Sequence, residues 1–192
     1  MKKTAIIAVV VFMMAAPSGS AFAANSLAQG SKGISVGFGD SVFSNTAIPG
    51  VQGGTNVQNN VVDITGRYFM GKDFALYGGF GLQLNSSDYD GTYFSLKFGA
   101  RKYLSTNDFA PFVGAQLSYV SEDMKNPAGT KITDLTVVDL AALFGAEYFF
   151  SKNFSVEGAI GVGLGQASND LNNSDTTYLG TRTVGVHATF YF

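Results

Sequence analysis

Apolar residues alternate with small or polar residues along most of this chain. In the stretch 92–104, for example, Phe94 and Leu96 fall on one face, and Ser95 and Lys97 fall on the other. Side chains two positions apart share one face of a β-strand, so strict alternation predicts strands rather than helices. The pattern predicts eight strands of about ten residues each, at residues 33–39, 61–69, 74–83, 92–104, 109–120, 135–149, 154–165 and 178–192.

A turn pattern separates these strands and occurs three times, at residues 67–74, 101–109 and 147–154. Each copy begins with a charged residue, continues with aromatic residues and a short polar turn, and ends in Asp-Phe or Asn-Phe. Such a turn between two alternating runs is typical of a β-hairpin. Longer polar stretches connect the strands at their other ends, at residues 40–60, 85–91, 121–134 and 166–175. Short turns at one end and long loops at the other are typical of bacterial membrane barrels.

The two faces of the predicted strands differ in a way that favours a membrane barrel over a soluble one. One face carries bulky Leu, Ile, Val and Phe, whereas the other carries Gly, Ala, Ser and Thr together with charged residues. An eight-stranded barrel encloses a space just wide enough for side chains, so the small and charged face fits the interior. The bulky face would expose more apolar surface than soluble monomers tolerate. The sequence therefore predicts an all-β, closed, eight-stranded antiparallel up-and-down barrel that spans a membrane; a soluble barrel or sandwich is the alternative.

Charged residues of both signs fall on the predicted inner face. They are Asp63, Arg67, Lys97, Arg101, Asp139, Glu147 and Glu157. Charge removed from bulk water must be paired or hydrated, so these residues predict a network of ion pairs that fills the lumen. A path for ions with a charged gate is the alternative. The narrow interior of an eight-stranded barrel favours the network.

The amino-acid composition narrows the class of protein and its expected partners further. Charged residues make up 14% of the chain, below the roughly 25% of soluble domains. The chain has no cysteine, so disulfides do not stabilise it. The balance of charges is mildly acidic and lacks a basic run, which excludes nucleic acid as an expected partner.

The N-terminus has the features of a secretory signal peptide. Lys2 and Lys3 precede the apolar stretch 5–16, and the small-residue site Ala21-Phe22-Ala23 follows it. We expect residues 1–23 to be cleaved and residues 24–192 to form a single barrel domain. A membrane anchor is the alternative, but the apolar stretch is short for one.

The mature chain resembles the OmpA/OmpX-type family of small outer-membrane β-barrels. The resemblance rests on the three hairpins at 67–74, 101–109 and 147–154 and on the final strand 183–192. That strand looks like the family's C-terminal assembly signal, with Gly185, alternating apolar residues including Phe190, and the terminal Phe192. The resemblance implies an integral protein of the bacterial outer membrane. It also implies recognition by the outer-membrane assembly machinery and contact with outer-membrane lipids and lipopolysaccharide.

Catalytic, cofactor and metal sites are not expected. His187 is the only histidine and lacks a neighbouring serine motif of the kind that lipid A-modifying barrels use. We therefore expect a monomeric structural barrel that presents its long loops to the outside, where they could bind an extracellular ligand. A narrow porin-like channel for ions or small solutes is the alternative function, and a lipid A-modifying enzyme is less favoured.

Overall fold

The structure is a computed structural model that describes residues 27–38, 41–43, 56–58, 62–86 and 90–192. Within these residues the chain forms ten β-strands and no helix that is long and apolar enough to span a bilayer. The strands are β1 (Lys32–Phe38), β2 (Ser41–Phe43), β3 (Asn56–Gln58), β4 (Asp63–Phe69), β5 (Phe74–Ser86), β6 (Asp90–Tyr103), β7 (Phe109–Lys125), β8 (Lys131–Ser151), β9 (Phe154–Asn169) and β10 (Ser174–Tyr191).

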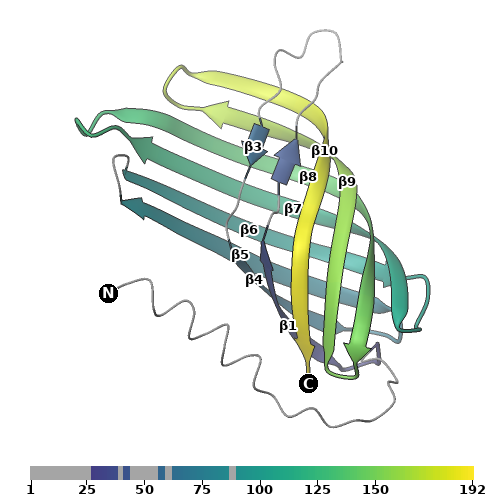
Figure 1. Cartoon of the computed structure of the whole chain (residues 1–192). Helices are drawn as coiled ribbons and strands as arrows, with labels where there is room; N and C mark the ends of the chain where they lie inside the picture. The colour runs from purple at the N-terminus through teal and green to yellow at the C-terminus, as the bar shows by residue number, and fades with distance from the viewer. Residues whose placement is uncertain (1–26, 39–40, 44–55, 59–61, 87–89) are drawn as a thin grey trace.

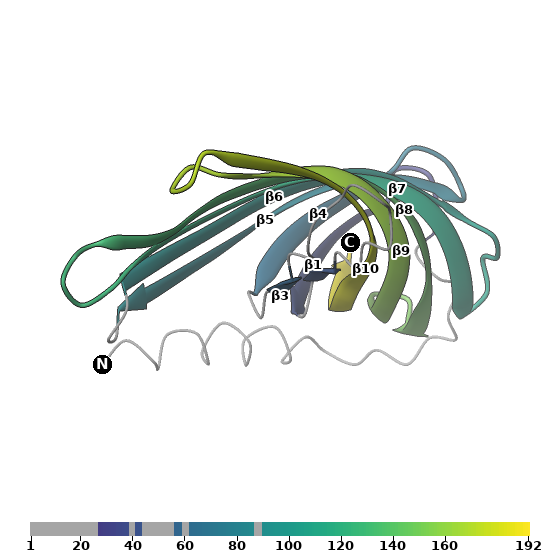
Figure 2. The same ribbon diagram turned by 90° about the horizontal axis from the view of Figure 1, so that it is seen from above.

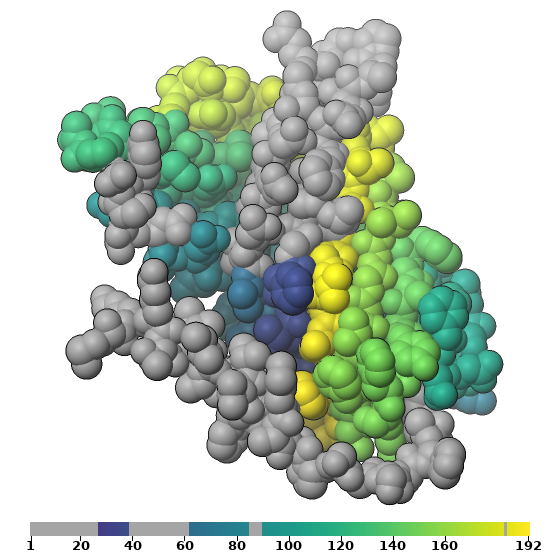
Figure 3. Space-filling model, viewed as in Figure 1, coloured from purple at the N-terminus to yellow at the C-terminus, as the bar shows by residue number. Residues whose placement is uncertain are grey.

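Eight of the strands close into an antiparallel barrel. The order around the ring is β1, β4, β5, β6, β7, β8, β9 and β10, and the pairing of β1 with β10 closes it. The purple β1 and the yellow β10 lie side by side in Figures 1 and 3. The short strand β2 pairs with β10 directly beyond β1, and β3 pairs with β2. Closure satisfies the backbone without leaving an edge in lipid, and the predicted eight-stranded barrel is confirmed.

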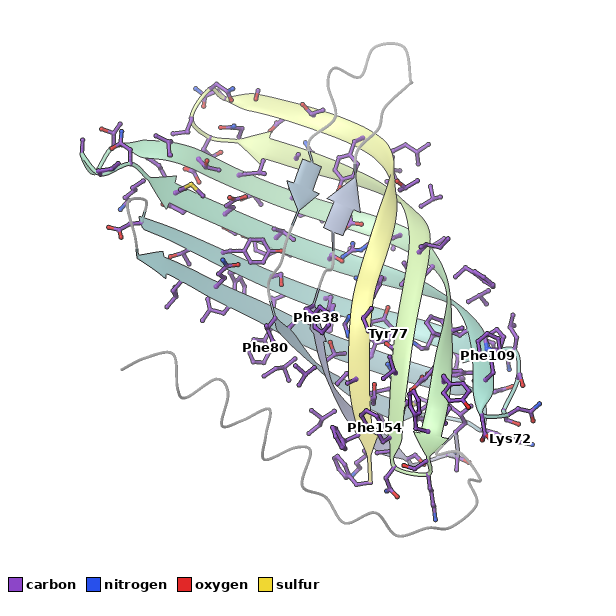
Figure 4. All side chains as sticks on the ribbon, viewed as in Figure 1. Phe38, Lys72, Tyr77, Phe80, Phe109 and Phe154 are labelled. Atoms are coloured by element: carbon purple, nitrogen blue, oxygen red, sulfur yellow. The ribbon has the colours of Figure 1, made fainter. Side chains whose placement is uncertain are left out.

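Burial alternates along the strands as the sequence pattern predicts. On β4, Asp63, Thr65 and Arg67 are buried, whereas Ile64 and Tyr68 are exposed. The exposed positions on most strands carry large apolar side chains, and Phe80 points away from the barrel in Figure 4 while Tyr77 is buried. A continuous apolar exterior of this kind suits the hydrocarbon of a bilayer. The apolar face of the barrel wall therefore points outward.

Three short turns lie at one end of the barrel, at residues 70–73, 104–108 and 152–153. The chain ends at Phe192 beside Lys32, whose backbone N–H and carbonyl both pair with Phe192. The short turns and the C-terminus therefore share one end, which we call the short-turn end. The opposite end, called the outer end below, carries the longer hairpins.

The outer hairpins differ from the predicted loops. The polar stretch 121–134 is mostly strand, because β7 runs to Lys125 and β8 starts at Lys131. The stretch 166–175 likewise contains the ends of β9 and β10, and the stretch 40–60 contains β2 and β3. In the stretch 85–91, residues 87–89 lie outside the described part of the chain. Figure 1 shows the resulting tall wall, in which β5 to β8 reach far beyond β1 and β4, and Figure 2 shows its curvature from above.

Glycines on the inner face make room for large side chains of the neighbouring strand. A Cβ at Gly99 would lie 2.3 Å from the ring of Tyr77 on β5. A Cβ at Gly37 would lie 2.5 Å from the ring of His187, so the imidazole packs flat against the backbone of β1. On the lipid face, the ring of Phe98 covers Gly78 in a similar way. These contacts account for glycine inside strands, where it is otherwise unfavourable.

Candidate functional site

The lumen contains all seven charged residues that the alternation pattern places on the inner face. Asp63, Arg67, Lys97, Arg101, Asp139, Glu147 and Glu157 are each at most 5% exposed. They come from strands β4, β6, β8 and β9, so the closure of the barrel brings together residues that are far apart in sequence. Burial at this depth is tolerated only when each charge has a partner.

Arg67 is the centre of the network near the short-turn end. Its Nη1 donates to Glu147 Oε2 at 2.9 Å, and its Nη2 donates to Glu157 Oε2 at 2.7 Å. Arg101 Nη1 donates to the same oxygen of Glu157 at 2.5 Å. Two guanidinium groups and two carboxylates therefore form one connected cluster across the lumen.

Hydroxyl groups complete the shell around Glu147. Tyr103 donates to Oε2 at 2.6 Å, Tyr191 donates to Oε1 at 2.5 Å, and Ser155 also donates to Oε1. Together with Arg67, these groups provide four hydrogen bonds to a carboxylate that is fully buried. A carboxylate held this way is compensated for the water it has lost.

Two further ion pairs lie nearer the outer end. Lys97 Nζ donates to Asp63 Oδ2 at 2.5 Å, and His187 Nδ1 lies 3.7 Å from the other oxygen of Asp63. Arg182 Nη1 donates to both oxygens of Asp139, at 2.6 and 2.7 Å. With Arg182 included, four basic and four acidic side chains of the described residues are buried in the lumen, so their formal charges cancel when the histidine is neutral.

Arg182 is a charged lumen residue that the alternation pattern misses, and the reason is a β-bulge in β10. The pairing of β10 with β9 shifts between Val184 and Val186, so Gly185 is the extra residue. Uninterrupted alternation predicts that Val184 and Val186 both face outward. The prediction is wrong for Val184, which is 4% exposed in the lumen, whereas Val186 is 48% exposed. Gly185 inside the strand was the sequence signal for this bulge, although β10 also contains Gly180.

An aromatic layer fills the lumen at the short-turn end. Its members come from six strands and from the segment that precedes β1, and they are Leu27, Phe69, Ala75, Tyr103, Ala110, Phe112, Phe149 and Tyr191. The rings of Phe69 and Tyr103 stack with centroids 5.6 Å apart. Arg101 joins this layer to the charged network, because its guanidinium lies 4.3 Å from the ring centroid of Phe112. A second apolar cluster lies in the lumen toward the outer end, formed by Tyr93, Val120, Val137, Ala167 and Tyr178.

The hairpin β7–β8 is fixed at its tip by polar contacts. Lys131 Nζ contacts Asp123 at 2.7 Å and Asp134 at 2.5 Å. Hydrogen bonds to these two carboxylates raise the pKa of Lys131 above its ordinary value. Asn126 accepts hydrogen bonds from the backbone N–H groups of Ala128 and Thr130 through its side chain. The tip is therefore an ordered turn rather than a loose loop.

The predicted assembly signal occupies the strand that closes the barrel. The Phe190 ring lies 5.0 Å from that of Phe154, on the outside of the short-turn end. Phe192 is 70% exposed, so its side chain contributes little to packing within the barrel. Gly185 forms the bulge described above.

The ionisable side chains of the lumen are held in place by ion pairs and hydrogen bonds. The carboxylates of the lumen are bound by arginine, lysine or hydroxyl donors. Among the described residues, no three His, Cys, Asp or Glu side chains lie close enough to hold a metal ion. His187, which sequence inspection singles out as the only histidine, lies against Gly37 and Asp63 inside the ion-pair region.

Solved structures share this architecture at low sequence identity. Ail, the attachment invasion locus protein of Yersinia pestis, matches with 15% identity and a TM-score of 0.52 over 85% of this chain and 99% of that one. Neisserial surface protein A matches with 15% identity and a TM-score of 0.55 over 85% and 98%. The N-terminal β-barrel domain of Pseudomonas aeruginosa OprF matches with 18% identity and a TM-score of 0.51 over 85% and 98%. No family model matches the sequence, and no curated protein matches it.

The structural likeness and the apolar exterior agree with each other. The ring of eight strands matches nearly the full length of these barrels, and its outer surface is suited to lipid. The protein has the fold of the OmpA/OmpX-type small outer-membrane β-barrels, with an apolar outer surface suited to a lipid bilayer.

Proposed function

We propose that the protein is a structural barrel that stabilises the outer membrane and presents a stiff β-wall to the outside for surface interactions. Its lumen serves as a polar core and not as a conduit. The observation that carries the proposal is the filling of the lumen by ion pairs of zero net charge between two apolar layers.

The height of the outer wall supports the surface role. Strand β8 has 21 residues and β10 has 18, whereas a tilted strand crosses a bilayer with about 9 to 11. The additional length of β7 and β8 stands beyond the membrane as a hairpin whose tip is held by Lys131 and Asn126. A rigid surface binds a partner with a smaller loss of conformational entropy than a flexible loop.

The charge of this wall indicates which extracellular ligands suit it. At the outer end the described acidic residues outnumber Lys125 and Lys131; they are Asp90, Glu122, Asp123, Asp134, Asp170 and Asp175. Ail has been solved in complex with sucrose octasulfate, a heparin analogue. An acidic wall repels such sulfated ligands, so we propose that this chain binds a neutral or cationic partner instead.

Planar bilayer recordings test the closed lumen. We expect purified, folded wild-type protein to give no steady conductance steps. Steady steps whose size changes in Arg101→Ala would instead support the narrow channel.

A loop replacement tests the surface role. Residues 122–134 are replaced by a two-residue turn, and the adhesion of cells that carry this variant is compared with that of cells that carry the wild-type barrel. The matched control replaces the short turn 104–108, which should leave adhesion unchanged.

The route into the membrane is part of the proposal. The outer-membrane assembly machinery recognises the final strand through Phe190 and Phe192, which lie on the outside of the strand that closes the barrel. Lipid A chemistry at His187 is not part of the proposed function. Unchanged lipid A after overexpression would be consistent with its absence, whereas modified lipid A would contradict the structural role.

A further inference from the structure

The two ends of the barrel differ in surface charge. At the short-turn end, Lys32, Lys72, Lys102 and Lys152 are exposed, and Asp73 and Asp108 are the only acidic residues on the surface there in the described part of the chain. We call these four lysines the basic rim. At the outer end the acidic residues exceed the lysines by six to two within the described residues. The lumen contributes nothing to this difference, because its charges are balanced and buried.

Three lysines of the basic rim, Lys32, Lys102 and Lys152, lie beside outward-facing aromatic residues on the strands. Lys32 pairs with Tyr68 across β1 and β4, and Lys102 pairs with Phe74 across β5 and β6. Figure 4 shows Lys72, Phe109 and Phe154 at the same end of the barrel.

The turn that contains Lys152 joins two exposed or partly exposed rings. Phe150 precedes it and Phe154 follows it, with the ring centroids 5.8 Å apart. Phe154 in turn contacts Phe190 on β10. The short-turn end therefore carries a belt of aromatic rings with lysines at its margin.

This combination fits one region of a bilayer. Aromatic rings of a barrel settle at the boundary between headgroups and hydrocarbon. A lysine beside such a ring has its ammonium group at the depth of the lipid phosphates, because its long stem extends along the apolar surface. Negative headgroups attract basic residues at this depth. The short turns mark the periplasmic side, where the facing leaflet consists of phospholipids.

We propose that the basic rim binds the headgroups of anionic phospholipids in the periplasmic leaflet. The recognised chemistry is a phosphate diester with a net negative charge, such as phosphatidylglycerol. All four lysines of the rim contribute to the attraction, and the contribution of Lys102 is reduced by its contact with Asp73 at 2.6 Å. The proposal rests on the membrane orientation but not on the surface role, so it survives if the outer wall has no partner.

Spin-labelled lipids test the proposal directly. The folded barrel is placed in phosphatidylcholine bilayers that contain a trace of spin-labelled phosphatidylglycerol or phosphatidylcholine, and the motionally restricted fraction is measured for each. We expect the wild-type protein to favour phosphatidylglycerol about threefold, and the preference to vanish at about 1 M salt, where the screening length falls to about 3 Å. The variant K32Q/K72Q/K152Q should lose the preference even at low salt.

Matched variants show whether the preference for phosphatidylglycerol comes from the basic rim or from the overall charge of the protein. K72Q/K152Q removes two lysines from the rim, and K125Q/K131Q removes two from the tip of the outer β7–β8 hairpin, which stands beyond the opposite face of the same bilayer. Only the first should lower the preference, and D73N/D108N should raise it. An unchanged preference in K72Q/K152Q, or an equal fall in both double variants, would overturn the proposal. Heat-dependent mobility on gels verifies that each variant is folded.

Discussion

Arg67 and Glu147 join opposite sides of the barrel. Four positions separate β4 from β8 in the ring of eight strands, yet Arg67 Nη1 lies 2.9 Å from Glu147 Oε2. This ion pair links the two walls through the centre of the lumen. Tyr103, Tyr191 and Ser155 donate hydrogen bonds to the carboxylate of Glu147.

Substitution of Glu147 should therefore be costly. In Glu147→Ala, Arg67 keeps Glu157 but loses one counter-charge, and three hydroxyl donors lose their acceptor. We expect the free energy of unfolding to fall by about 3 to 5 kcal/mol, the usual cost of breaking a buried ion pair. Urea unfolding in lipid vesicles measures it, with Glu122→Ala on the outer hairpin as control. A change as small as that of the control would show that this ion pair contributes little.

The contact between Gly37 and His187 predicts a compensating pair of substitutions. The three nearest heavy atoms that a Cβ at residue 37 would meet all belong to the His187 ring. Gly37→Ala should destabilise the barrel by about 1 to 3 kcal/mol through overpacking. Adding His187→Ala to Gly37→Ala should recover part of the loss, because the ring is then gone.

Gly66→Ala is the control for this pair, since its nearest neighbour would be a backbone oxygen 3.9 Å away. Thermal unfolding in detergent is the measurement. Additive losses in the double variant would argue that the two residues do not share space.

The bulge at Gly185 can be detected by cysteine labelling. The chain has no native cysteine, so Val184→Cys and Val186→Cys each carry a single fluorescent label. We expect a lipid that carries a nitroxide quencher on its acyl chain to quench the label at 186 strongly and the label at 184 weakly, because Val184 lies in the lumen. Phe144→Cys on the lipid face is the positive control. Equal quenching at 184 and 186 would mean that the strand has no bulge.

Substitution of Phe192 should affect assembly of the barrel but not its stability. The side chain of Phe192 is 70% exposed, so Phe192→Ala should leave the unfolding midpoint of the purified barrel nearly unchanged. In cells we expect the same variant to reach the outer membrane several times more slowly, since we propose that the assembly machinery recognises this position. Pulse-labelling and heat-dependent gel mobility report the rate. An equal loss of stability in vitro would assign Phe192 a packing role instead.

Period-two alternation is a local property, which is why the sequence alone placed Asp63, Arg67 and Glu157 in the lumen. Which of them pair depends on how far each strand is staggered against the next, and no local pattern encodes this stagger. The bulge moved Arg182 and Val184 because one additional residue exchanges the two faces of everything before it.

The outer strands illustrate a different limit. Residues such as Asp123 and Lys131 look like loop residues, because charged side chains lower strand propensity. In the folded chain Asp123 lies opposite Asp134 across the hairpin, and Lys131 contacts both carboxylates, which supports the strand pairing. The predicted strands 109–120 and 135–149 are therefore shorter than β7 and β8 at the outer end.

The meeting of β1 with β10 has a consequence for how the protein is made. Ser35 and Thr189 share a hydrogen bond although 154 positions separate them in the chain. Contacts of such long sequence separation form slowly, and until the last strand is synthesised the nascent polypeptide has two unpaired edges that invite aggregation. Closure of the ring by β1 and β10 removes both edges in one step, so a delay in this single pairing prolongs the time in which two copies can associate.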